Sequence, residues 1–93
     1  MEVESIRHKA LRQLFLDGRT KGLIEPQRLF DMLTFIRVAR DFEALAQPPN
    51  FGFHALTGDR KNRYSMTVTK NWRLTFNRID DHTIADLDLE DYH

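Results

Sequence analysis

The stretch from Tyr64 to Asn77 reads YSMTVTKNWRLTFN and decides the fold. Apolar and polar side chains alternate through residues 64–69 and again through residues 72–77, with Lys70 and Asn71 between the two runs. A period of two is typical of a strand with one buried face, and a short connection joins antiparallel neighbours. The stretch therefore predicts two adjacent antiparallel strands.

Further strands are predicted on both sides of this stretch. Residues 84–90 alternate after a turn at Asp80-Asp81, and we expect Ala85, Leu87 and Leu89 to point inward and Ile84 outward with the acidic residues. Residues 51–56 form a short strand candidate that ends before the turn residues 58–62, and residues 2–6 form a weaker one.

Two helices are predicted in the first half of the chain. Residues 8–17 carry Leu11, Leu14 and Phe15 at helical spacing, and Gly18 follows as a stop. Pro26 suits the first turn of a second helix, which extends through residue 39. Since helices in this order cover one face of the sheet, the sequence predicts one α+β domain over residues 1–93, with an N-terminal strand and two helices packed on one face of an antiparallel sheet.

Composition narrows the functional classes. The 93 residues contain no cysteine, which excludes disulfides and thiolate metal sites, and no apolar run long enough to span a membrane. The first residues lack the pattern of a signal peptide, so the expected location is the cytoplasm.

The formal net charge is zero, but the charges are unevenly distributed. Residues 59–73 contain five cations and one acid, whereas residues 80–91 contain acids and no Lys or Arg. A neutral but polarised domain can bind a polyanion on one face, although each run is equally consistent with a solvated sheet surface. The candidate RNA contacts are Arg60, Lys61, Arg63 and Lys70.

Strand alternation gathers polar side chains on the face that the helices leave open. With Phe53 inward, His54 falls on that face beside Arg73, and Tyr92 can join them, whereas Asp91 shares the parity of the inward residues. Imidazole, guanidinium, phenol and carboxylate groups together can cleave RNA without a metal: a base deprotonates the ribose 2′-OH, a cation stabilises the phosphorane, and an acid protonates the leaving oxygen.

Each candidate also has a simpler interpretation. His54 is equally a surface or capping histidine, Arg73 a cross-strand partner of Asp86 or Asp88, and residues 91–93 a polar tail. The residue pattern alone leaves these alternatives open.

Two motifs connect the chain to a known family. One is HALTGDR at residues 54–60, continuing to YSMTV at 64–68, and the other is NWRLTF at 71–76 with the closing LEDYH at 89–93. Together with residues 5–15, they resemble HigB toxins, the plasmid-maintenance killer proteins of the RelE/ParE superfamily.

The resemblance implies a RelE-like microbial RNase fold and a type II toxin that cleaves mRNA in the ribosomal decoding site without a metal or cofactor. It implies products with a 2′,3′-cyclic phosphate and a 5′-hydroxyl. It also implies a HigA-type helix-turn-helix antitoxin, through which alone the complex contacts operator DNA. The site residues that it implies are His54, Arg73, Asp91, Tyr92 and His93.

The chain departs from the family pattern at two positions. Many relatives read HPLKGDR where this chain has Ala55 and Thr57, so a cation beside the groove is missing, and Arg60 and Lys61 are candidates to replace it. Two alternative functions follow: a ParE-like toxin that binds gyrase without catalysis, and a degenerate toxin that acts as an antitoxin-bound corepressor.

Overall fold

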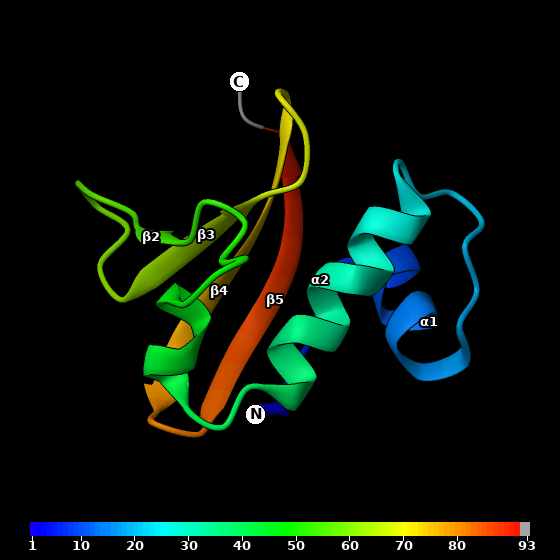
Figure 1. Ribbon diagram of the computed structural model, residues 1–93. Helices are drawn as coiled ribbons and strands as arrows, with labels where there is room; N and C mark the ends of the chain where they lie inside the picture. Colours follow the sequence, from blue (N-terminus) through cyan, green and yellow to red (C-terminus); the bar gives the residue numbers. More distant parts are fainter. Residues whose placement is uncertain (92–93) are drawn as a thin grey trace.

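A computed structural model describes residues 1–91. The helices are α1 (Lys9–Asp17) and α2 (Pro26–Val38). A short 3-10 helix, η1 (Phe42–Ala46), follows α2. The strands are β1 (Glu2–Val3), β2 (His54–Ala55), β3 (Arg63–Thr67), β4 (Trp72–Asp80) and β5 (Thr83–Asp91). The predicted order of strand, two helices and four strands is confirmed (Figure 1).

The five strands form one mixed sheet in the order β1-β5-β4-β3-β2. The last four are antiparallel neighbours in sequence order, as their short turns predict. The N-terminal strand was expected among the elements packed on the sheet. It instead belongs to the sheet, where Glu2 pairs in parallel with Thr83 and Ile6 bridges Leu87.

Both helices lie on one side of the sheet, with α2 beside β5 and α1 farther out (Figure 1). The residues of the helices and strands that face each other form one hydrophobic core. Its fully buried members include Leu11, Met32, Ile36, Leu74 and Phe76. The apolar residues of both helices and of residues 72–76 therefore pack into the core, as their spacing predicts.

The helix ends follow from particular residues. His8 Nδ1 accepts a hydrogen bond from the Leu11 amide at 3.1 Å, which caps the start of α1. Gly18 ends the helix in the left-handed region, with φ of 72°. Pro26 occupies the first position of α2, as predicted.

The alternation predicted for β5 is wrong before Leu87. A bulge shifts the β4–β5 register, and Asp86 has a φ of 53°. Asp86 is held there because its carboxylate accepts from Asn77 Nδ2 and its amide donates to Ser5 Oγ. As a result Ile84 is completely buried, and Ala85 pairs with Asn77.

β2 is shorter than the six-residue strand predicted from the sequence. Asn50, Phe51 and Gly52 all have positive φ values, so the chain reaches extended geometry only just before His54. The strand is nevertheless held on the core side of the sheet, because the ring of the preceding residue, Phe53, stacks on Tyr64 and Phe76 with centroids 5.6 and 6.2 Å apart.

Candidate active site on the helix-free face of the sheet

Two rows of polar residues cross the face that no described helix covers. One row runs through the paired residues His54, Ser65, Thr75 and Asp88. The next row runs through Thr67, Arg73 and Glu90. Because paired residues project to the same face of a sheet, His54 and Arg73 share one face, as the alternation predicts.

His54 stands at the exposed edge of this face. Its Nδ1 lies 2.8 Å from the Gly52 carbonyl oxygen. A carbonyl can only accept, so in neutral His54 the proton sits on Nδ1 and the Nε2 lone pair is available. The backbone therefore orients the ring as a potential proton acceptor.

Gly52 is fixed by the same local structure. It has φ of +69°, and a Cβ built on it would lie 3.1 Å from Thr67 Oγ1. A larger residue would be strained by the backbone and crowded by β3. The glycine thus allows the close approach to β3 while its carbonyl oxygen lies within hydrogen-bond distance of His54 Nδ1.

The closing residues do not all share this face. Asp91 pairs with Trp72, whose ring packs against the hydrophobic core, so the β5 register directs Asp91 to the opposite side from Arg73. This agrees with the parity predicted for Asp91. Tyr92 and His93 lie outside the described residues.

Glu90 is the acid that the register places beside Arg73, and it was not among the expected site residues. Its two oxygens accept a bidentate pair from Arg60, with distances of 2.9 and 2.7 Å. Oε2 also lies 3.5 Å from Arg63 Nη2 and accepts a hydrogen bond from Thr75 Oγ1. The alternation of residues 84–90 indicated which face of the sheet Glu90 would occupy. Its pairing with Arg60 could not be predicted, because Arg60 lies in a loop without a strand or helix period.

The network determines the electrostatics of the face. Hydrogen bonds from Arg60 and Thr75, opposed by burial, lower the pKa of Glu90 from 4.5 to about 2. The same carboxylate raises the pKa of Arg60, whereas burial lowers that of Arg63. Glu90 is therefore ionised at every physiological pH, and its single negative charge offsets part of the charge of the two guanidinium groups.

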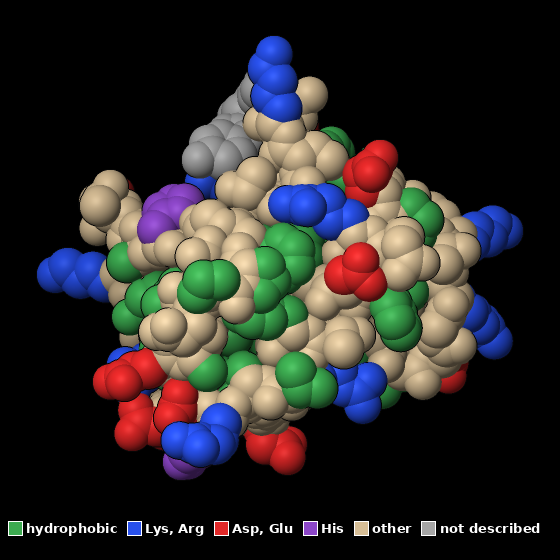
Figure 2. Space-filling model, viewed as in Figure 1, with side chains coloured by type: hydrophobic (Ala, Val, Ile, Leu, Met, Phe, Trp, Pro, Cys, Tyr) green, Lys and Arg blue, Asp and Glu red, His purple; other side chains and the backbone are tan. Residues whose placement is uncertain are grey.

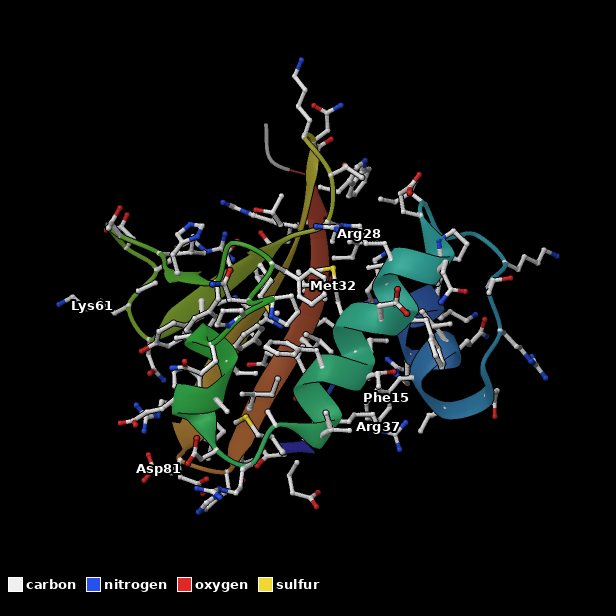
Figure 3. All side chains as sticks on the ribbon, viewed as in Figure 1. Phe15, Arg28, Met32, Arg37, Lys61 and Asp81 are labelled. Atoms are coloured by element: carbon white, nitrogen blue, oxygen red, sulfur yellow. The ribbon has the colours of Figure 1, made fainter. Side chains whose placement is uncertain are left out.

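The four expected RNA-binding cations differ in their surroundings. Arg63 is only 5% exposed and also donates to Thr75 and Asn77, so it is part of the sheet surface. Lys61 and Lys70 are exposed, and Lys61 points away from the sheet at the loop between β2 and β3 (Figure 3). Arg60 and Arg63 are engaged by Glu90, whereas the lysines project outward.

The opposite end of the molecule is acidic. Asp41, Glu43, Asp81 and His82 line a small recess between η1 and the β4–β5 turn. Figure 2 shows acidic side chains gathered at the lower left, where these elements lie in Figure 1. Of the acidic run in residues 80–91, Asp81 lies at this end, whereas Glu90 is paired with Arg60 and Arg63, so the two charged runs are only partly separated in space.

Two classes of feature are not found in the part of the chain that is described. Residues 1–91 contain no group of three or more His, Cys, Asp or Glu side chains placed to hold a metal ion. None of their helices is long and apolar enough to cross a membrane.

The fold and this face define a small α+β protein in which a histidine, arginines and carboxylates lie on the same helix-free surface of the sheet. Residues 4–93 match the family described as the RelE-like toxin of the type II toxin-antitoxin system HigB. The chain is also 37% identical over 93 residues to a protein of Proteus vulgaris named Endoribonuclease HigB, a match covering 98% of this chain and 99% of that protein. The chain therefore belongs to the HigB-like toxin family, and a type II toxin implies an antitoxin partner.

Proposed function

We propose that this toxin is an endoribonuclease that acts in the cytoplasm, cuts mRNA in the decoding site of the ribosome and so inhibits translation. The observation that carries the proposal is the placement of His54 and Arg73 on one polar sheet face. The Proteus vulgaris relative, named as an endoribonuclease, supports the same chemistry.

In the proposed reaction, His54 Nε2 takes the proton of a ribose 2′-OH. The 2′-oxygen attacks phosphorus, the bond from phosphorus to the 5′-oxygen breaks, and the products are a 2′,3′-cyclic phosphate and a 5′-hydroxyl. Arg73 stabilises the charge that develops on the phosphate. His93, with Tyr92, is proposed to protonate the leaving oxygen, and Asp91, which the register directs to the opposite side from Arg73, is proposed to position these two residues from the end of β5; no metal or cofactor takes part.

Binding requires cations that can reach RNA phosphates. Lys61 and Lys70 are exposed and are proposed to contact mRNA or ribosomal RNA. Of the two candidates to replace the missing cation at Thr57, Lys61 is proposed to do so, because Arg60 is paired with Glu90. The proposed antitoxin is a HigA-type helix-turn-helix protein, and operator DNA is contacted only through it.

The test is cleavage of mRNA on programmed ribosomes by purified His54→Ala and His93→Ala variants. Loss of a general acid or base should slow cleavage by about 10²–10⁴-fold. His82→Ala is the matched control, because His82 is an exposed histidine in the β4–β5 turn at the other end of the molecule. In cells, His93→Ala or removal of residues 91–93 should abolish growth inhibition while circular dichroism shows an intact fold.

Three outcomes would contradict the proposal. Full toxicity after truncation would remove residues 91–93 from the site. DNA-damage signalling without mRNA cleavage would indicate a ParE-like gyrase toxin. The absence of growth inhibition on induction without antitoxin would indicate a corepressor.

A further inference from the structure

The Glu90 carboxylate joins three elements that are distant in sequence. Arg60 comes from the loop between β2 and β3, Thr75 from the middle of β4, and Glu90 from the end of β5. The loop is fastened to β3 by the hydrogen bond from the Leu56 amide to the Arg63 carbonyl, at 2.9 Å. Through its carboxylate, Glu90 therefore links the end of β5, next to Asp91, to the loop that follows His54 and β2.

The geometry of this contact is more specific than that of an ordinary surface ion pair. Arg60 meets the carboxylate with two nitrogens, an arrangement that fixes orientation as well as distance. The Glu90 side chain is 22% exposed, between Arg60 at 36% and Arg63 at 6%, so solvent screens the Arg60 side of the cluster more than the Arg63 side. Thr75 is completely buried. Its hydroxyl joins the other two residues, because it donates to Glu90 and accepts from Arg63 Nη2 at 2.8 Å.

The same geometry argues against Arg60 as a direct phosphate ligand. One N–H of each of its Nη atoms is taken by the carboxylate, so the guanidinium would have to leave Glu90 before it could bind a phosphate with the same pair of N–H groups. Departure would also leave Glu90 with weaker compensation beside an incoming phosphate, which is unfavourable for two anions. Lys61, the next residue in the loop, is exposed and forms no ion pair with a carboxylate among the described residues.

We propose that Glu90 is a positioning residue of the RNA-cleaving site, and that Arg60 serves this carboxylate rather than the RNA. The Glu90–Arg60 pair holds the end of β5, up to Asp91, in a fixed relation to the loop that follows His54 and β2. This inference rests on the proposed function. It predicts that the pair affects the rate of cleavage and not the binding of the ribosome-bound mRNA.

The experiment is a double-mutant cycle with Arg60→Ala, Glu90→Gln and the combined variant. Single-turnover cleavage on programmed ribosomes gives the rate constant at saturation and the half-saturating concentration separately. Each single substitution should lower the rate constant about tenfold or more, because small misplacements of reacting groups are costly. The combined variant should be no slower than the slower single variant, since the two residues act as one unit.

Lys61→Ala is the matched control from the same loop. It should raise the half-saturating concentration and reduce its dependence on salt, because a phosphate contact is lost. Arg60→Ala should leave that salt dependence unchanged. Thermal unfolding of every variant separates loss of position from loss of fold, and Arg60→Ala alone decides the question if Glu90→Gln does not fold.

Multiplicative losses in the combined variant, or a reduced salt dependence for Arg60→Ala, would overturn the inference and make Arg60 an RNA ligand. Faster cleavage by Glu90→Gln would also overturn it, because the carboxylate would then be repelling RNA. If the wild-type toxin itself cleaves no RNA, the proposed function fails and the positioning role fails with it. That result is distinct from an active wild type with an unaffected Glu90→Gln variant.

Discussion

At the scale of single residues, Glu90 should make stability depend on acid pH. Its folded-state pKa of about 2 lies below the ordinary value of 4.5, so its contribution is fully present above about pH 4.5 and is lost as pH falls through 2. Wild type should exceed Glu90→Gln in free energy of unfolding by about 1–2 kcal/mol at neutral pH, since water partly screens the Arg60 pair. The difference should shrink between pH 4.5 and 2.

Urea unfolding of both proteins at several pH values measures this. Glu43→Gln is the reference substitution, because Glu43 lies on η1, away from the network. A difference between wild type and Glu90→Gln that stays constant down to pH 2 would show that the carboxylate gains nothing from its ionised partners.

The role of a residue could be predicted from the sequence only where the residue and its partner both lie in strands with alternating side chains. The facing of Arg73 was predictable because it lies in a regular strand, and that of His54 because the alternation holds from Phe53 to His54 even though β2 has only two residues. Glu90 had the right parity, yet its function as a hub depends on Arg60 in an aperiodic loop. The bulge at Asp86 was not predictable from alternation, because contacts with Ser5 and Asn77 stabilise its positive φ.

At the scale of elements, β2 is the critical one, because its two residues carry His54. The sequence predicted a strand here but not its shortness, since Asn50 and Phe51 adopt positive φ without being glycine. The approach to β2 depends on Gly52 and on the Phe53 ring, so the element is positioned by its flanks.

Gly52→Ala tests this dependence. A Cβ at positive φ and 3.1 Å from Thr67 Oγ1 should cost about 1–2 kcal/mol of stability and shift the carbonyl that orients His54. Cleavage should therefore fall more than the loss of folded protein explains. Gly18→Ala is the control, because Gly18 also has positive φ but nothing lies within 4 Å of its added Cβ.

Denaturant unfolding and ribosome-dependent cleavage are measured on both glycine variants. Equal specific activity of the folded Gly52→Ala and Gly18→Ala proteins would mean that the Gly52 carbonyl does not position the histidine.

At the scale of the whole molecule, one side of the sheet supplies stability and the other supplies the candidate chemistry. Leu87 is completely buried on the helix side and bridges Ile6 across the β1–β5 boundary. Leu87→Ala should destabilise the protein by about 2–5 kcal/mol, a large part of the 5–15 kcal/mol typical of a domain. Ile79→Ala, at a site 52% exposed, should cost much less in the same unfolding experiment; comparable losses would mean that the core does not extend to β5 as described.

The parallel pairing of β1 with β5 has a consequence in time. Glu2 is made well before its partner Thr83, and β5 lies between β1 and β4. Such long-range pairing is slow to form and cannot begin before its second strand exists. A nascent chain that lacks β5 has neither the middle of its sheet nor Glu90, so the candidate site cannot assemble before that strand has been synthesised.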